Sequence, residues 1–256
     1  MTDQHIVVTG GGSGIGRATA ILAAAAGARV SVLDRDGTAA EQTVHAAATD
    51  GCGAQACDVT DSVALRMALD AAESALGPIT GLVAAAGIDR GGLAHELPEQ
   101  TWRDVVDVNL TGAFLAAQDV LRRMVAARTR GALVLCSSPA AFVGFAAGGA
   151  SAYAASKGGV SALTRSLAVD YAAHGIRVNA VVPGATETPL MWAAVAEAER
   201  GAMRKQVEQE VPLGRLADPT EPARAVLWLL GQESSYVTGS HLVCDGGVLA
   251  KASISV

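Results

Sequence analysis

Short apolar runs alternate with longer alanine-rich stretches along the whole chain. The short runs predict strands at His5–Thr9, Ala28–Asp34, Ala54–Asp58, Gly81–Ala86, Ala132–Ser137, Arg177–Val182 and His241–Cys244. The longer stretches predict helices near residues 15–26, 38–49, 61–76, 99–127, 151–173 and 219–231. Strands that are apolar along most of their length are typical of a parallel sheet covered by helices on both faces. The pattern therefore predicts an α/β fold with a doubly wound, Rossmann-like, seven-stranded parallel sheet.

Nothing in the chain marks a boundary between domains. No linker or low-complexity tract interrupts residues 1–256, so we expect a single dinucleotide-binding and catalytic domain. The segment at about 184–211 departs from the alternation, because it follows the sixth predicted strand and runs into a charged helix before Pro212. Ligands of doubly wound sheets bind at the carboxyl ends of the strands. An insertion at that position predicts a substrate lid.

Composition narrows the class of partner. Half of the residues are hydrophobic (50%) and 17% are charged, which excludes a disordered chain. The net charge of −6 and the aromatic content of 4% disfavour nucleic acids and anionic membranes as partners. Residues 131–156 carry no charge, but Pro139 and several glycines interrupt them, so no membrane segment is predicted. Four cysteines without metal-ligand spacing and an N-terminus without signal-peptide features favour reduced thiols and a cytoplasmic location, with no metal.

A glycine-rich segment, Thr9–Gly16, connects the first predicted strand to the first predicted helix. Glycines in this position permit a tight turn, so that the amides at the helix N-terminus can receive a pyrophosphate. A merely flexible loop is the alternative, but the flanking strand and helix favour a dinucleotide site.

Asp34 ends the second predicted strand, eighteen residues after Gly16. In a dinucleotide fold this carboxylate would accept hydrogen bonds from the adenosine ribose and would repel a 2′-phosphate, which favours NAD over NADP. A role in the turn Asp34–Gly37 is the alternative, and the adjacent Arg35 keeps NADP open as the less favoured cofactor.

Tyr153 and Lys157 lie four residues apart near the start of a predicted helix, on one face of it. A free tyrosine has a pKa of about 10 and needs a nearby positive charge to act as an acid or base near neutrality. Lys157 can supply that charge. Taken singly, the tyrosine also fits a core position and the lysine a solvated one.

Several motifs occur in a fixed order along the chain. They are the glycine loop, Asp34, Cys57-Asp58-Val59, Val108-Asn109, Ser137-Ser138, Tyr153-x-x-x-Lys157, Val182-Pro183-Gly184, Val237-Thr238-Gly239 and Asp245-Gly246-Gly247. In these motifs the chain resembles the short-chain dehydrogenases/reductases over essentially its whole length.

The resemblance implies a catalytic tetrad. Tyr153 would be the acid/base, Lys157 would lower its pKa and hold the nicotinamide ribose, Ser138 would bind the substrate oxygen, and Asn109 would order a water for proton relay. The same resemblance implies that the cofactor is held by Gly10, Ser13, Gly14, Ile15, Gly16, Asp34, Asp58, Val59, Ala85, Gly87, Tyr153, Lys157, Pro183, Thr186 and Thr188.

Two features depart from the family pattern. The family usually has Asn-Asn-Ala-Gly after the fourth strand, whereas this chain has Ala84-Ala85-Ala86-Gly87, which removes side-chain amides and puts cofactor affinity in question. The spacing between Ser138 and Tyr153 is two residues longer than usual, so the 139–152 loop is expected to reshape the pocket. The adjacent Ser137 leaves the serine assignment open.

These features predict an NAD(H)-dependent oxidoreductase that interconverts a secondary alcohol and a ketone. We expect the substrate pocket to be lined by residues 89–95, by residues 139–152 and by Leu190–Trp192, although Met191 and Trp192 also fit simple packing of the lid. These segments are mainly uncharged or apolar, with Arg90 and His95 as exceptions. A small to medium, neutral, fairly hydrophobic molecule is therefore the expected substrate.

Two alternatives remain at this point. One is a 3-oxoacyl thioester reductase that docks an acidic carrier protein through Arg122, Arg123, Arg128 and Arg130, although such enzymes favour NADP and Asp34 argues against it. The other is a catalytically idle dinucleotide sensor or scaffold. Helices 99–127 and 151–173 resemble the pair that builds oligomers in the family, which implies a homotetramer.

Overall fold

Seven parallel strands form one sheet in the order β3-β2-β1-β4-β5-β6-β7. The computed structural model describes residues 1–145, 148–193 and 195–251. The strands are β1 (His5–Thr9), β2 (Arg29–Asp34), β3 (Cys52–Ala56), β4 (Gly81–Ala84), β5 (Gly131–Cys136), β6 (Ile176–Pro183) and β7 (His241–Cys244). The predicted doubly wound parallel sheet is confirmed, and the described residues form one domain around it.

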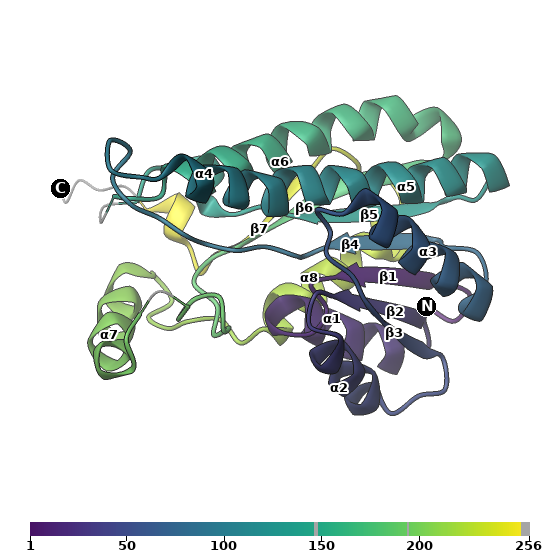
Figure 1. Ribbon diagram of the computed structural model, residues 1–256, viewed down its shortest axis with the longest axis horizontal. Helices are drawn as coiled ribbons and strands as arrows, with labels where there is room; N and C mark the ends of the chain where they lie inside the picture. The colour runs from purple at the N-terminus through teal and green to yellow at the C-terminus, as the bar shows by residue number, and fades with distance from the viewer. Residues whose placement is uncertain (146–147, 194, 252–256) are drawn as a thin grey trace.

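Helices cover both faces of the sheet (Figure 1). On one face lie α3 (Ser62–Leu76), α4 (Glu99–Val106), α5 (Gly112–Ala127) and α6 (Ser151–Tyr171). On the other lie α1 (Gly14–Ala25), α2 (Gly37–Ala47) and α8 (Thr220–Leu230). Each face has its own apolar core, with Leu69, Leu121 and Leu133 in one and Val30, Val226 and Leu229 in the other. Across the described residues, every helix is too short or too polar to traverse a bilayer.

The predicted helical stretch near residues 99–127 is interrupted. A π-helical turn over Asp107–Thr111 separates α4 from α5. Such a turn accommodates one extra residue, which rotates the side chains that follow it. Asn109 lies within the turn and is buried, and Gly112 follows it at a position where a Cβ would approach Val59 to 2.6 Å. The prediction of a helical stretch near 99–127 is confirmed, and the π-helical turn within it is a feature that hydrophobic periodicity does not reveal.

The observed ends of two strands also differ from the predicted ones. β3 begins and ends two residues earlier than predicted, because the chain turns away from the sheet at Asp58, whose side chain accepts hydrogen bonds from the backbone N and the hydroxyl of Thr60. β4 ends at Ala84 rather than Ala86. The start of α3 is fixed by Asp61, which accepts hydrogen bonds from the backbone N atoms of Val63 and Ala64.

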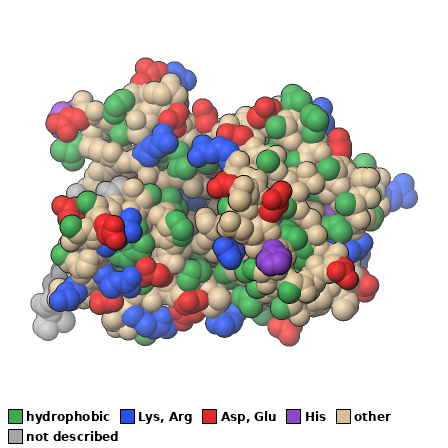
Figure 2. Space-filling model, turned by 60° about the horizontal axis from the view of Figure 1, so that its bottom comes forward, with side chains coloured by type: hydrophobic (Ala, Val, Ile, Leu, Met, Phe, Trp, Pro, Cys, Tyr) green, Lys and Arg blue, Asp and Glu red, His purple; other side chains and the backbone are tan. Residues whose placement is uncertain are grey.

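The strand order places a ligand crevice beside β1. β1 pairs with β2 on one side and β4 on the other, so the two crossovers leave in opposite directions at that point. In doubly wound sheets this switch opens a crevice at the carboxyl ends of the strands. The helix α7 (Arg200–Glu210) stands apart from the body beyond those ends, at the left of Figure 1. On the face shown in Figure 2, acidic and basic side chains are interspersed among apolar ones.

Candidate active site

A cavity of about 570 Å³ opens at the carboxyl ends of the central strands. It brings together residues that lie far apart in the sequence. Among the residues predicted from the sequence, those that line it are Gly10, Ser13, Gly14, Ile15, Gly16, Asp34, Asp58, Val59, Ala85, Gly87, Ser138, Tyr153, Lys157, Pro183, Thr186 and Thr188. Asn109 lies behind the cavity wall.

The glycine loop is folded tightly at the floor of the cavity. Gly10 has a φ of +66°, and a Cβ there would lie 2.6 Å from the Cα of Ala86. Ser13 precedes α1 without a side-chain capping bond, and the first turn of α1 contains no acidic residue. The first amides of α1 therefore keep their capacity to bind an anion, and the partial positive charge of the helix N-terminus favours one. This arrangement fits the pyrophosphate of a dinucleotide.

Asp34 and Asp58 line the cavity near the carboxyl ends of β2 and β3. The Asp34 carboxylate accepts hydrogen bonds from the backbone N of Gly12 at 2.8 Å and of Asp36 at 3.0 Å, one on each oxygen, which fixes its orientation beside the loop. The hydrogen bonds from Thr60 hold the pKa of Asp58 below its usual value, so this carboxyl is ionised at neutral pH. Ala85 keeps its backbone beside the loop by donating to Thr9 O at 3.2 Å, despite the missing amide side chains.

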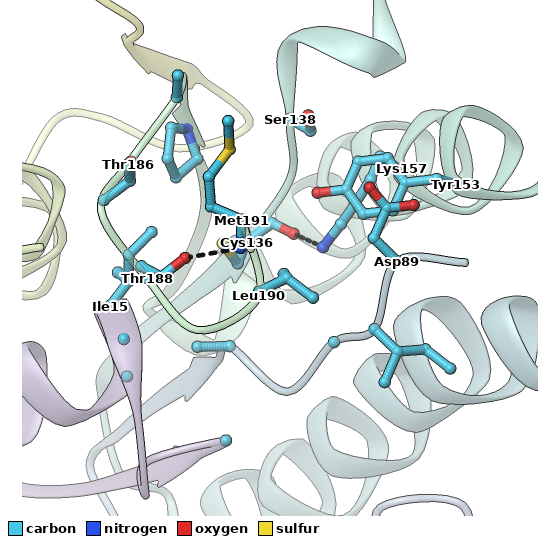
Figure 3. A pocket seen from close by; sticks show the side chains of 18 of the residues that line it. Ile15, Asp89, Cys136, Ser138, Tyr153, Lys157, Thr186, Thr188, Leu190 and Met191 are labelled. Carbon is cyan, nitrogen blue, oxygen red and sulfur yellow. Dashed lines mark hydrogen bonds between the residues drawn. The ribbon is translucent and has the colours of Figure 1, made fainter. Parts of the chain in front are cut away.

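Tyr153 and Lys157 extend from the first turns of α6 into the cavity (Figure 3). The Lys157 Nζ donates a hydrogen bond to the Cys136 carbonyl at 2.7 Å and lies 5.6 Å from the centroid of the Tyr153 ring. Burial lowers the pKa of Lys157, and the nearby Asp89 opposes that shift.

The phenol of Tyr153 is protonated at neutral pH, because its pKa is raised. Burial raises its pKa, neighbouring Cys136 and Asp89 add to the rise, and a hydrogen bond with the Ser138 hydroxyl lowers it. The resemblance implies that Lys157 lowers this pKa, and that role stays a prediction. Lys157 is itself desolvated, and its Nζ donates to a backbone carbonyl.

The two adjacent serines differ in their surroundings. The Ser137 hydroxyl is buried against α6, where it donates to the Lys157 carbonyl at 3.2 Å and pairs with the Ser161 hydroxyl at 2.7 Å. The Ser138 hydroxyl accepts a hydrogen bond from Ala140 N at 3.2 Å and lies beside the Tyr153 phenol. Geometry therefore favours Ser138 as the serine presented to a ligand.

Asn109 holds the backbone of the connection that leaves β4. Its Oδ1 accepts from Ile88 N at 2.8 Å, and its Nδ2 donates to Ile88 O at 2.9 Å and to Ser156 Oγ at 3.1 Å. Both amide hydrogens are thus in use within the protein. A water bound to this side chain would therefore have to donate to Oδ1, which accepts only one hydrogen bond among the described residues.

Comparison with known proteins agrees with the fold. The family model described as Enoyl-(Acyl carrier protein) reductase matches residues 10–249. A 2,5-dichloro-2,5-cyclohexadiene-1,4-diol dehydrogenase of Sphingobium indicum is 38% identical over 252 residues, which are 98% of each chain. The crystal structure of a short-chain type dehydrogenase/reductase from Mycobacterium marinum superposes with a TM-score of 0.91 at 34% identity, covering 98% of this chain and 97% of that one. The chain belongs to the short-chain dehydrogenase/reductase family.

A further member of this family extends the comparison. The 3-ketoacyl-(acyl-carrier-protein) reductase from Brucella melitensis, whose crystal structure is complexed with NADH, is 30% identical with a TM-score of 0.89, over 96% of this chain and 98% of that chain. The chain is accordingly an oxidoreductase of the short-chain dehydrogenase/reductase family that acts on CH–OH and C=O groups. Enzymes of this kind use a nicotinamide dinucleotide.

The substrate side of this short-chain dehydrogenase/reductase corrects the expectation about charge. Asp89, which lies within the predicted 89–95 segment, lines the cavity, and the sequence reasoning overlooked its charge. Of the two charged residues expected there, Arg90 pairs instead with Asp104 at 2.9 Å, and His95 faces Glu96 at 3.5 Å. The available signal was the position of Asp89 directly after Gly87 and Ile88, at the carboxyl end of a central strand.

The 139–152 loop contributes Pro139 and Phe145 to the cavity, while residues 146–147 lie outside the described part of the chain. The segment at 184–211 contributes Leu190 and Met191. It also contributes four residues of α7 that sequence reasoning did not single out, namely Met203, Gln206, Val207 and Glu210.

Trp192 does not face the cavity, so the expectation that it contacts substrate was wrong. Its side chain is buried, its Nε1 donates to the Glu187 carboxylate at 2.7 Å, and the Arg204 guanidinium lies 5.3 Å from its ring. Arg204 also forms an ion pair with Glu187. These three side chains, which we term the Trp192 clasp, hold α7 to the chain that leaves β6. An indole with a polar donor and a large apolar ring is suited to such packing.

Proposed function

We propose that this protein is an NAD(H)-dependent dehydrogenase/reductase that interconverts a secondary alcohol and a ketone, with Asn109, Ser138, Tyr153 and Lys157 as its tetrad. The observation that carries the proposal is the convergence of Tyr153, Ser138 and Lys157 in one cavity with an uncapped glycine-loop helix. The test is a panel of secondary alcohols and ketones, followed through the absorbance of reduced nicotinamide with NAD and NADP in separate assays.

The dinucleotide would be held along the carboxyl edge of the sheet. In our proposal the glycine loop binds the pyrophosphate, while Asp34, Asp58, Val59, Ala85 and Gly87 surround the adenosine. Pro183, Thr186 and Thr188 lie at the nicotinamide end, together with Tyr153 and Lys157. When bound, the nicotinamide ring would accept a hydride during oxidation of the alcohol and donate one during reduction of the ketone.

The side chains of the tetrad handle the proton. For reduction of a ketone, the Tyr153 phenol donates its proton to the carbonyl oxygen, and the Ser138 hydroxyl donates a hydrogen bond to the same oxygen. The Lys157 ammonium stabilises the phenolate that remains, since it lies within 5.6 Å of the ring. For oxidation the steps reverse, and the phenolate takes the proton of the carbinol hydroxyl.

Asp34 is expected to set the preference for NAD. Its carboxylate would lie against a 2′-phosphate, and two like charges in close contact cost several kcal/mol. In Asp34→Asn the shape is kept and the charge is lost, so the ratio of kcat/KM for NAD to that for NADP should fall about tenfold or more. Asp36→Asn is the matched control, because Asp36 is a neighbouring exposed acid whose role is to cap α2. Equal kcat/KM for the two cofactors in the unmodified protein would contradict the proposal.

The segment at 184–211 is proposed to close over bound dinucleotide. Thr188 already touches the glycine loop, since a Cβ on Gly14 would lie 3.1 Å from the Thr188 methyl group, and α7 has no fully buried residue. We therefore expect NAD to slow amide hydrogen exchange in this segment more than in β1 or β4. Exchange at the same rate with and without NAD would instead indicate a rigid wall.

The carrier-protein alternative loses part of its basis. Arg123 is engaged within the fold by Asp70, Glu73 and Asp119, at 2.8, 2.7 and 2.6 Å, and is therefore not available to an acidic carrier. We propose a small-molecule substrate, for which the relative that acts on a cyclohexadiene diol gives additional support.

We also propose a homotetramer that assembles through α5 and α6. These helices and the π-helical turn before α5 share an outward apolar face around Leu110, Phe114, Gly159 and Leu163, and Phe114 is 38% exposed. All four cysteines are free thiols in the structure, which supports a reducing, cytoplasmic environment.

A further inference from the structure

Asp89 is held firmly in the wall of the cavity. It lies in the connection that leaves β4, and its carboxylate is directed into the cavity beside Tyr153 (Figure 3). On one side of it, the backbone of Ile88 is bonded twice to the buried Asn109 side chain. On the other, Gly92 N donates to Gly149 O at 2.8 Å. These bonds on both sides fix the backbone from which the Asp89 side chain extends into the cavity.

The carboxylate of Asp89 has no partner among the described residues. The shifts of its pKa come from burial, which raises the value, and from the charge of Lys157, which lowers it, with no hydrogen bond involved. The neighbouring Arg90 is paired with Asp104 on the outside of the loop. Asp89 is exposed, so water solvates its carboxylate until a ligand enters the cavity, and a donor on the ligand then has to replace that water.

Charge decides which kind of donor fits. Lys157 and Asp89 contribute one positive and one negative group to the same part of the cavity. The charge of Lys157 would repel a ligand ammonium, and the charge of Asp89 would repel a ligand carboxylate. A neutral hydroxyl avoids both repulsions and forms a charge-assisted hydrogen bond to the carboxylate. The other side chains on the substrate side include Phe145, Leu190 and Met191, which are apolar.

We infer that Asp89 binds a second hydroxyl group of the substrate, so that the enzyme selects neutral diols or polyols with an apolar remainder over simple alcohols and over acids. The inference rests on the proposed function, because the carbinol that reacts is the one held by Tyr153 and Ser138. Asp89 is thus a specificity-determining residue that acts on a part of the substrate other than the reacting carbon.

The test compares matched substrates. For the wild type, Asp89→Ala and Asp89→Asn, kcat/KM is measured with NAD for cyclohexanol, cyclohexane-1,2-diol, cyclohexane-1,4-diol and 4-hydroxycyclohexanecarboxylate. The wild type should favour at least one diol over cyclohexanol. Asp89→Ala should lower the ratio of kcat/KM for that diol to kcat/KM for cyclohexanol about tenfold to about a hundredfold, as expected for a hydrogen bond to a charged group. Asp89→Asn should lower it less, because its amide oxygen still accepts, and should improve use of the acid.

Glu96→Gln is the matched control, since it removes an exposed carboxylate from the same connection, outside the cavity. It should leave the diol ratio at the wild-type value. An equal loss on all four substrates in Asp89→Ala would show that Asp89 acts only through Lys157 and Tyr153, and would overturn the inference.

A binding experiment separates this inference from the proposed function. If the wild type oxidises none of the four compounds, diol and cyclohexanol are titrated into the protein with NADH bound, and NADH fluorescence is followed. Tighter binding of the diol that is lost in Asp89→Ala supports the inference even then. Equal affinities for diol and cyclohexanol would overturn it.

Discussion

Replacement of Tyr153 by phenylalanine is expected to reduce kcat by about a thousandfold, within the range known for loss of a general acid or base. The change removes the only proton that our mechanism transfers and keeps the ring that packs near Lys157. Binding of NAD, measured by calorimetry, should be largely retained, because the phenol contributes little to the glycine-loop contacts.

Tyr236→Phe is the control for this substitution, since Tyr236 is fully exposed and lies outside the cavity. It should have wild-type kcat. Substantial turnover in Tyr153→Phe would remove Tyr153 from the mechanism. A wild-type protein that binds NAD but turns over no alcohol or ketone would revive the sensor or scaffold alternative.

Replacement of Lys157 by methionine should damage two properties at once. The methionine fills most of the space of the buried lysine stem but removes the ammonium, so the phenolate of Tyr153 loses its stabilising charge and the nicotinamide ribose loses a donor. We expect kcat to fall by about a hundredfold or more, and the Kd for NAD to rise about tenfold.

Lys205→Met serves as the comparison, because Lys205 is exposed on α7 and does not line the cavity. A thermal melt should accompany the measurement, since Lys157 Nζ bonds the Cys136 carbonyl and its loss leaves that carbonyl unpaired. Unchanged NAD affinity in a folded Lys157→Met protein would contradict the proposed double role.

Much of the fold could be predicted from hydrophobic pattern and turn residues. The strand at His241–Cys244 was predicted with its observed bounds, because a short apolar run is a local signal. The π-helical turn at Asn109 could not be predicted in this way. It depends on a tertiary contact, the bonds between a buried amide and the backbone of Ile88, and leaves the local pattern of apolar residues unchanged.

The same distinction between local signals and tertiary contacts applies to the candidate site. The residues of the glycine loop and the Tyr153–Lys157 pair were found because their spacing fixes them on one turn or one helical face. The orientations of Asp89, Arg90 and Trp192 could not be predicted from the sequence. Those of Arg90 and Trp192 depend on partners that lie elsewhere in the sequence, and Asp89 has no such partner among the described residues. Arg90 forms an ion pair with Asp104, and Trp192 packs with Glu187 and Arg204. Of these three residues, Asp89 is the one that faces the cavity.

The Trp192 clasp also gives this protein an intrinsic optical reporter. Of the three tryptophans in the chain, Trp102 and Trp228 are 41% and 39% exposed, whereas Trp192 is 8% exposed and lies under a guanidinium. Opening of α7 would bring the Trp192 indole into water while the other two indoles keep their surroundings. The emission of Trp192 should then shift to longer wavelength in proportion to the open population. Stopped-flow fluorescence of the unlabelled protein could therefore time the movement of α7 during a catalytic cycle.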